Sequence, residues 1–473
     1  MKSLPLLLAV ALGSTAHAKP EQANQGGQER TLKVLSANLW HDLAVKPHYF
    51  RQGLAELRHL DADVILAQEA DGATARLAKA LGMHYWQGPQ HLGSMGILSR
   101  YPIVKTFDLG AEAPGGQLGA VIDVHGRLVT LWNNHLDYTR YTAYFARGGN
   151  GTSWQALPGC QPYSDEQLEA ANESSLRPRQ ARLMVKALAP LVDKRAPVII
   201  GGDFNEPTGS DWTAATADLF DHKNVSYDFS SHRIVRQAGF TDSYRALYPD
   251  PVSHPGISWP FRLEDSWTQG PSYQRECGRG LDDRDRIDFI YYNRDAKALR
   301  LDSVAWVGPR FHTYFGYEQD LDWQRDPHVG RLVQDGEPRY GRHDFPSDHL
   351  WYLASFRIKA GKKQLSEGLV LNPELVLVES REDEQGLQLT VDVEHAELLS
   401  DAQSYYLYAS TFEAGPGDYS GGWIPVPVTG EDKLRLSITV PAAFLANDDI
   451  QLRLYHRLGG SHRVDAVLDI ERP

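Results

Sequence analysis

The sequence predicts an α/β domain followed by a small all-β domain. Apolar runs of strand length alternate with segments of helical periodicity over residues 31–361. Beyond a linker at residues 360–363, alternating polar and apolar residues lie between Gly and Pro clusters, a pattern typical of a β-sandwich. Because 473 residues exceed one ordinary domain, we expect two folded units, residues 31–361 and an accessory β-sandwich at 362–473.

The individual elements follow from these patterns. In the first unit we expect strands at residues 31–39, 64–68, 96–99, 120–124, 127–133, 196–200, 286–292 and 350–358. Helical spacing of apolar residues predicts helices at 49–60, 73–81 and 177–192. In the second unit, period-two alternation predicts strands at 387–393, 404–412, 434–440 and 450–458.

The N-terminus has the pattern of an export signal. Lys2 precedes an apolar run from Leu4 to Leu12, and Ala16-His17-Ala18 fits a cleavage site. We therefore predict a signal peptide at residues 1–18, then a flexible segment at 19–30, and a secreted or periplasmic protein. The alternative is a short buried helix. No other apolar run approaches the length of a membrane span, so none is predicted.

Two cysteines, Cys160 and Cys277, are too few for a disulfide scaffold or a zinc cluster. Both lie in segments without regular periodicity, and export permits a disulfide. We predict that they form one. The alternative is two separate buried thiols.

The charge is unevenly distributed. The formal net charge is -13, and residues 362–473 hold 19 acidic against 9 basic residues. This acidity discourages nonspecific binding of nucleic acid but leaves room for a local basic groove.

Polar residues stand at the ends of the predicted strands of the first unit. Each has an ordinary structural explanation, such as a turn, a helix cap or a satisfied core histidine. If these strands ended at one edge of a sheet, the polar residues would lie together. One shared site then explains the six positions better than six unrelated structural roles. The residues are Asn38, Glu69, His135, Asp203 with Asn205, and Asp348 with His349, and Asp288 lies inside a further apolar strand.

These side chains suit hydrolysis at phosphorus. Hard oxygen ligands without cysteine favour Mg²⁺, with Mn²⁺ or Ca²⁺ as alternatives, over structural zinc. Histidines can bind phosphate oxygens and stabilise developing charge. A buried carboxylate such as Asp288 needs a partner, and an aspartate beside a histidine favours the charged imidazole.

An ordered set of short motifs resembles the endonuclease/exonuclease/phosphatase superfamily, which includes DNase I-like nucleases, sphingomyelinases and inositol-phosphate phosphatases. The resemblance implies that residues 31–361 are the catalytic domain, a four-layer α/β sandwich with two packed mixed sheets and the site at their C-terminal edge. The matching segments are residues 36–40, 61–65 with 68–69, 96–100, 134–136, 202–205, 286–289 and 347–349.

The resemblance also implies roles for the site residues. Asn38 and Glu69 resemble the metal-binding pair, with Asp348 helping to hold the metal or its water. Asp203 resembles the residue that activates or orients the attacking water, and Asn205 the amide that orients phosphate.

The two histidines complete the set. His135 and His349 resemble ligands of the phosphate and of the transition state, with Asp288 paired to His349. Arg177 and Gln180 resemble an inward-facing polar pair that supports the site. Asp137 and Tyr138 are near the site in sequence without an assigned role.

Three long segments rich in aromatic and Arg residues bear on the substrate: residues 138–175, 253–272 and 306–345. Each adjoins a strand that carries a site residue, so we expect them to be irregular and to rise around the pocket. A walled pocket favours a small phosphate ester, hydrolysed by a secreted, Mg²⁺-dependent phosphatase or phosphodiesterase.

Two other functions stay open. One is an extracellular nuclease, since aromatic and Arg side chains also stack bases. The other is a binding protein on the same scaffold, with the β-sandwich as its interaction module. The sequence predicts neither the leaving group nor the oligomeric state.

Overall fold

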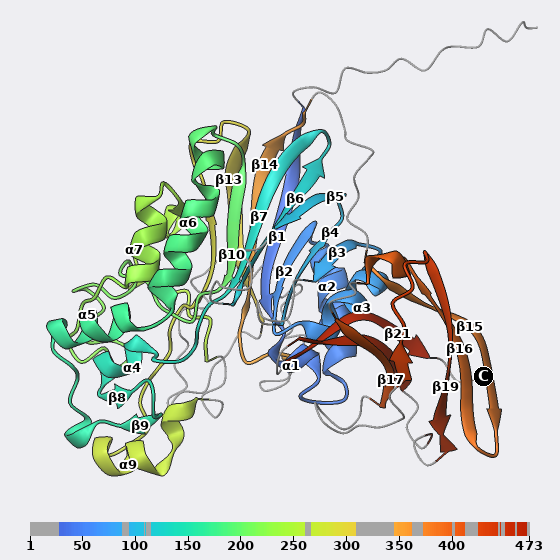
Figure 1. Ribbon diagram of the computed structural model, residues 1–473. Helices are drawn as coiled ribbons and strands as arrows, with labels where there is room; N and C mark the ends of the chain where they lie inside the picture. The colour runs from blue at the N-terminus through green and yellow to red at the C-terminus, as the bar shows by residue number, and fades with distance from the viewer. Residues whose placement is uncertain are drawn as a thin grey trace, which may run out of the picture.

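Two six-stranded mixed sheets form the first part of the chain (Figure 1). The computed structural model describes residues 28–87, 94–107, 109, 115–260, 266–308, 345–361, 372–399, 403–411, 424–442, 445, 450–458 and 461–470. In spatial order the first sheet contains β13 (Leu299–Val307), β14 (Trp351–Lys359), β1 (Glu29–Asn38), β2 (Val64–Gln68), β4 (Met95–Ser99) and β3 (His84–Gln87). The second contains β11 (Thr241–Asp242), β12 (Asp288–Tyr292), β10 (Val198–Asp203), β7 (Arg127–His135), β6 (Gln117–Val124) and β5 (Ile103–Phe107).

Each sheet has one parallel pair at its centre. In the first sheet β1 runs parallel to β2, and in the second β7 runs parallel to β10, while the other pairs are antiparallel. Parallel strands end at the same edge of a sheet, and their antiparallel neighbours begin there. The ends of β1, β2, β7 and β10 therefore lie near the starts of β12 and β14.

Helices cover the outer faces of the two sheets, which gives four layers. Apolar residues of both sheets, with those of α2 (Tyr49–Leu60) and α3 (Asp71–Leu81), form one core. On the other side, α6 (Arg177–Asp193) and α7 (Ser230–Gln237) bury Met184, Leu188 and Val235 against Trp132 of β7. The predicted α/β fold with two packed mixed sheets is confirmed.

The sheets approach one another closely behind the strand ends. A Cβ added to Gly201 of β10 would lie 2.5 Å from Cδ1 of Leu66 in β2, so this position has no room for a side chain. Beside it, the Gln68 Nε2 amide donates to Asn133 Oδ1 at 2.7 Å. This buried bond joins the two sheets next to their shared edge.

The segment 138–175 is not irregular, so that prediction is wrong. It contains α4 (Thr142–Arg147), β8 (Gly149–Asn150), β9 (Gln155–Ala156), a 3₁₀ turn (Pro158–Cys160) and α5 (Asp165–Ser174). Helix α4 is buried along its whole length, so it shows no apolar stripe in the sequence. Helix α5 begins at a capping box made by Ser164 and Gln167, a sequence signal that predicts a helix.

Other elements were also not predicted. Among the helical ones they include α1 (Trp40–Leu43), α7, α8 (Ser243–Leu247), α9 (Pro271–Cys277) and a 3₁₀ turn (Trp267–Gln269). Among the strands they include β3, β5, β11 and β13 of the two large sheets, and β15 (Glu374–Asp383), β18 (Ile424–Val426) and β21 (Ser461–Ile470) further on. Strand β1 begins at Glu29, so residues 29–30 belong to a strand and not to the flexible segment expected there. The predicted signal peptide, most of residues 19–30, and residues 261–265 and 309–344 lie outside the described residues.

Cys160 and Cys277 form the predicted disulfide. They are 117 residues apart and join the 3₁₀ turn before α5 to the end of α9. The segment 138–175 is thereby tied to α9, which begins at the end of the segment 253–272, below the strand ends in Figure 1.

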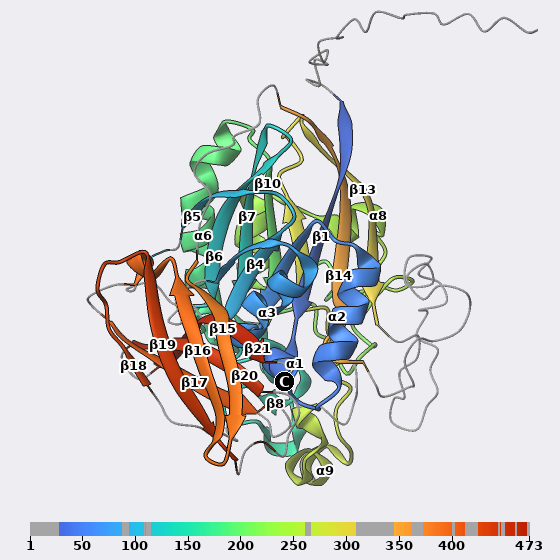
Figure 2. The ribbon, with the colours of Figure 1, turned by 90° about the vertical axis from the view of Figure 1, so that its right-hand side faces the viewer.

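Residues 372–470 form two small antiparallel sheets beside the first unit (Figure 2). One contains β15 (Glu374–Asp383), β16 (Gly386–Glu394) and β19 (Lys433–Pro441). The other contains β18 (Ile424–Val426), β17 (Ser404–Thr411), β20 (Ile450–Leu458) and β21 (Ser461–Ile470), with a 3₁₀ turn at Ala396–Leu398 between β16 and β17. Alternating residues such as Leu389, Val391, Leu407 and Leu452 form a core of their own. The position of the boundary at residue 361 stays a prediction.

Among the described residues, no helix has the length and apolar character needed to cross a membrane.

Candidate active site

The sheet registers bring the predicted site residues to one edge. Asp203, the last residue of β10, is paired with His135 of β7 on one side and with Asp288 of β12 on the other. In the first sheet, Asn38 is the last residue of β1, and His349 lies two residues before β14, the neighbour of β1. The polar strand ends predicted from the sequence therefore meet in space.

Asn38 lies at the centre of the group and is fully buried. Its Nδ2 atom lies 3.2 Å from Glu69 Oε1, 3.2 Å from Asp203 Oδ2 and 3.4 Å from His349 Nε2. Its Oδ1 atom accepts the backbone N–H of Trp40 at 2.9 Å. The amide thus connects the carboxylates of the two sheets, and its role as a metal ligand stays a prediction.

His349 and Asp288 form a buried ion pair. His349 Nδ1 lies 2.9 Å from Asp288 Oδ2, and both side chains are almost fully excluded from solvent. Burial alone would lower the pKa of His349, but Asp288, Asp348 and Asp203 together raise it to about 10. The imidazole is therefore positively charged at neutral pH, as the predicted pairing requires.

Asp203 is flanked by two histidines. His135 Nε2 and His349 Nε2 each lie 3.7 Å from Asp203 Oδ2. Asp203 Oδ1 accepts the backbone N–H of Asn205 at 2.7 Å. Burial raises the pKa of Asp203 to about 6, a rise that His349 opposes and Asp288 adds to. A carboxylate with this pKa can accept a proton near neutral pH.

Glu69 and Asp348 are the more accessible carboxylates of the group. Glu69 Oε2 accepts the N–H of His41 at 2.8 Å, and its side chain is 25% exposed. Burial would raise the pKa of Glu69, but His135, this hydrogen bond and His349 together lower it, so the group stays ionised. Asp348 Oδ2 accepts the indole N–H of Trp259 at 3.1 Å.

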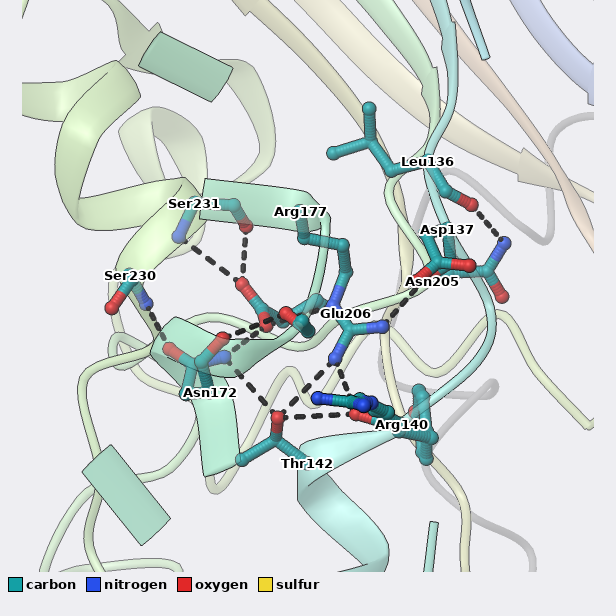
Figure 3. A network of polar contacts seen from close by, with 12 residues as sticks. Leu136, Asp137, Arg140, Thr142, Asn172, Arg177, Asn205, Glu206, Ser230 and Ser231 are labelled. Atoms are coloured by element: carbon teal, nitrogen blue, oxygen red, sulfur yellow. Dashed lines mark hydrogen bonds and ion pairs between the residues drawn. The ribbon is translucent and has the colours of Figure 1, made fainter. Parts of the chain in front are cut away.

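Asn205 and the loop after β7 are held by a buried network (Figure 3). The side chain of Asn205 donates to the carbonyl of Leu136 at 3.0 Å. Arg177 pairs with Glu206 at 3.0 Å, and its other nitrogens donate to the carbonyls of residues 137, 139 and 140. Gln180 accepts the N–H of Asp137 at 3.1 Å. Arg177 and Gln180 thus support the loop from behind, as predicted.

Glu206 is a supporting residue that the sequence analysis missed. It is fully buried and also binds Asn172 and Ser231 in addition to Arg177. Its place directly after the Asp203–Asn205 motif was the available signal. A buried carboxylate there indicates that the backbone of this loop is held rigidly.

Ser258 was also missed. Its Oγ accepts the N–H groups of Ile287 and Asp288 at 3.0 and 3.1 Å, and its carbonyl accepts the N–H of Leu350 at 2.9 Å. It thereby joins the start of β12 to the segment before β14 and fixes the spacing of Asp288 and His349. The surrounding sequence has no periodicity that would have indicated this contact.

A group of aromatic side chains extends from the site toward solvent. Trp259 lies 6.3 Å from the His349 ring and 5.7 Å from Trp267, and Trp267 lies 4.1 Å from Trp154 and 6.2 Å from Tyr138, measured between ring centroids. Tyr138 and Trp267 are 51% and 44% exposed. We call Tyr138, Trp154, Trp259 and Trp267 the aromatic cluster.

Most other aromatic residues of the segment 138–175 are buried. Tyr141, Tyr144 and Phe145 lie in a core that also contains Trp212, Phe229 and Trp259 of the aromatic cluster. Asp137 binds Thr139 through its carboxylate, in the loop outside this core. Only part of the segment 138–175 is therefore placed beside the site as predicted, because most of its aromatic residues stabilise the segment itself.

The donor set fits a hard divalent cation. Asp203, Asp288 and His349 offer atoms that all lie within 4.8 Å of one another, and Asp288 Oδ1 is buried without a hydrogen-bond partner among the described residues. However, a protonated imidazole cannot bind a metal, so His349 is better suited to anion binding. Carboxylate oxygens of Glu69, Asp348 and Asp203 remain as ligands of the kind that Mg²⁺ prefers.

This fold and this edge of polar residues define a phosphoester hydrolase scaffold. The profile of the Endonuclease/Exonuclease/phosphatase family matches residues 35–349, and the chain belongs to that family.

Known relatives are distant in sequence. An uncharacterized protein of Caenorhabditis elegans is 25% identical over 339 residues, which span 69% of this chain and 91% of that protein. Among solved structures, Danio rerio TDP2 complexed with a single-strand DNA product is 17% identical, with a TM-score of 0.39, over 69% of this chain and 98% of that one. An AP endonuclease from Archaeoglobus fulgidus is 15% identical, also with a TM-score of 0.39, over 68% and 98%.

The Asp288–His349 pair can be tested directly. Asp288→Asn keeps the shape of the side chain but removes its charge, so burial should dominate and lower the pKa of His349 by roughly 1–3. Imidazole NMR titration of the metal-free protein measures this change. Asp302→Asn, at an exposed pair with Arg357, is the control. An unchanged pKa of His349 in Asp288→Asn would contradict the assignment.

Proposed function

We propose that this protein is an exported hydrolase of phosphate esters that depends on a divalent cation and prefers a small ester to nucleic acid. The observation that carries the proposal is the position of Asp203. It lies between two histidines, one of them held positive by Asp288, and beside an amide from the opposite sheet. Such an arrangement serves water attack at phosphorus better than it serves a structural role.

Each side chain would have a different role in the reaction. Asp203, with a pKa near 6, would orient a water molecule and take its proton. The positive charge of His349, with His135 on the other side of Asp203, would stabilise the negative charge that develops on phosphate oxygens. Asn205 lies at the same strand end, where its amide would orient the phosphate.

The cation would be held from the Glu69 side. The carboxylates of Glu69 and Asp348 are the accessible ones of the group, and Glu69 lies 3.2 Å from the Asn38 amide. When bound, Mg²⁺ or a similar cation would supply charge to neutralise a phosphate oxygen. Glu69 is kept ionised by its neighbours, which suits a ligand of this kind.

The aromatic cluster supports a substrate with a planar organic group. Tyr138 and Trp267 both expose ring surface. Trp267 contacts Tyr138 on one side and Trp259 on the other, and the indole of Trp259 donates to Asp348. A phosphate held at Asp203 could therefore carry a ring that stacks on Trp267. The acidic C-terminal unit lies near α3 on the Glu69 side, where it would repel a long polyanion.

A nuclease is the second candidate. Exposed aromatic rings beside a phosphate site can stack a nucleobase as well as a smaller ring. The contacts of Tyr138 and Trp267 are compatible with both substrates. Relative rates on the two substrates therefore decide between them.

Export is supported by two features. The first residues have the pattern of a signal peptide, and the chain has a disulfide, a bond typical of oxidising compartments. We propose a secreted or periplasmic location.

The metal and the base are tested by Glu69→Gln and Asp203→Ala. Glu69→Gln should raise the Mg²⁺ concentration needed for half-maximal activity roughly 10-fold or more, because a neutral amide is a weaker ligand. Asp203→Ala should lower kcat at least ~100-fold with little change in Tm. Steady-state rates on bis-p-nitrophenyl phosphate with and without chelator measure both. Glu173→Gln, at a surface pair with Arg182, is the control. Full activity in chelator would refute the metal assignment.

Substrate preference is tested by comparing kcat/KM for small esters with that for plasmid and single-stranded DNA, at equal phosphate concentration and low salt. We expect the small ester to be turned over faster. Trp267→Ala should lower kcat/KM for a nitrophenyl ester roughly 10-fold, on the scale of one lost stacking contact. Leu398→Ala, equally exposed but in the C-terminal unit, should have no effect. Rapid DNA cleavage without small-ester turnover would favour the nuclease.

A further inference from the structure

The C-terminal unit packs on the helix that follows Glu69. Helix α3 begins at Asp71, and Figures 1 and 2 show β21 beside it. Ala75 of α3 packs against Val467 of β21, and Arg76 of α3 pairs with Asp469 of β21 at 3.0 Å. The side chain of Arg76 is 14% exposed and that of Asp469 is 50% exposed, so this pair lies at the rim of the interface.

A second arginine contact lies at the N-terminal end of α3. Arg453 lies on β20 of the C-terminal unit, and its guanidinium carbon is 3.3 Å from where a Cβ on Gly72 would stand. The absence of a side chain at Gly72 makes room for the guanidinium. Asp42, in the turn between β1 and α2, lies near the guanidinium of Arg453. Burial raises the pKa of the Asp42 carboxyl group, and the positive charge of Arg453 is the largest influence that lowers it.

Asp42 connects this arginine to the active site. Its carboxylate accepts the N–H groups of Gly72 and Ala73 at 3.2 and 3.0 Å, at the start of α3. Its own backbone N–H donates to the carbonyl of Glu69 at 2.8 Å. The next residue back, His41, donates its N–H to the Glu69 carboxylate at 2.8 Å.

The turn that carries these contacts needs support. Residues Trp40 to Leu43 all have positive φ values, 39°, 54°, 63° and 59°, although none is glycine. This left-handed conformation is unfavourable for residues with a Cβ, and it persists only where the surroundings hold it. The bonds of Asp42 to α3 are such a restraint, and Arg453 lies beside them.

We propose that the C-terminal β-sandwich is a positioning element of the active site, in which Arg453 holds Asp42 and the turn at residues 40–43 so that the His41 N–H fixes the Glu69 carboxylate. This inference rests on the proposed function, because it assigns Glu69 to a cation. Arg453 is then a positioning residue that acts through Asp42. The unit is a fixed part of the catalytic apparatus rather than an independent binding module.

The sign of one effect separates positioning from simple electrostatics. Removing a positive charge near a cation site would, by charge alone, tighten cation binding. Loss of positioning should instead weaken it, as when the groups that orient a metal ligand are removed. In the full chain, Arg453→Met should therefore raise the Kd for Mn²⁺ roughly 10-fold, measured by electron paramagnetic resonance without substrate. Arg453→Lys, which keeps the charge, should recover part of the affinity.

A control and a second variant complete the test. Arg435→Met removes an arginine of the same unit that pairs with Asp392, and it should leave the Kd unchanged. Asp42→Asn removes the charge and keeps only one of the two oxygens that accept from Gly72 and Ala73. Adding Arg453→Met to it should change the Kd by less than about 2-fold, since both variants break one pathway. If Arg453→Met is poorly folded, Asp42→Asn alone carries the test and should also raise the Kd.

Three results would overturn the inference. Unchanged or tighter Mn²⁺ binding in folded Arg453→Met would refute it while leaving the proposed function intact. Equal weakening in Arg435→Met would show a general loss of stability and would also refute it. A wild-type chain that binds no Mn²⁺, or that hydrolyses esters fully in chelator, would refute the proposed function and the inference with it.

Discussion

The buried pair of Asp288 and His349 is the interaction on which the rest of the site depends. A carboxylate and an imidazolium that are both removed from water are tolerated only if they compensate one another and their remaining atoms are satisfied. The 2.9 Å contact meets the first condition, and Ser258 and Ser347 hold the two backbone segments in place. Because His349 is thereby charged, it can face the carboxylate of Asp203, which comes from the other sheet.

The accuracy of the site therefore derives from how the two sheets meet. Each sheet contributes a parallel pair that ends at the same edge, and the sheets touch closely behind it at Gly201 and Leu66. The bond from Gln68 to Asn133 fixes their relative position. Functional groups built on strand ends of this kind are held more rigidly than groups on loops. The loops contribute mainly the aromatic cluster, which bears on the substrate rather than on the reaction.

Much of this could be predicted from local sequence. The apolar run at 64–68 and the helical spacing at 49–60 have the bounds of β2 and α2, because buried strands and amphipathic helices leave strong patterns. Polar residues directly after such runs indicated Glu69 and Asp203. Helix α4 could not be found, since it is buried all round. Ser258, Glu206 and the approach of Arg453 to Asp42 are contacts across long sequence separations, for which single residues carry no periodic signal.

The central claim is that the strand ends form a cation-dependent phosphoester site in which Glu69 is a metal ligand. Anomalous diffraction from crystals of the full chain soaked in Mn²⁺ tests it most directly. The account predicts one strong peak at about 2.0–2.2 Å from a Glu69 carboxylate oxygen, beside Asn38, and loss of that peak in Glu69→Gln crystals. A peak surrounded only by Asp203, Asp288 and a neutral His349, or no peak at this edge of the sheets, would contradict it.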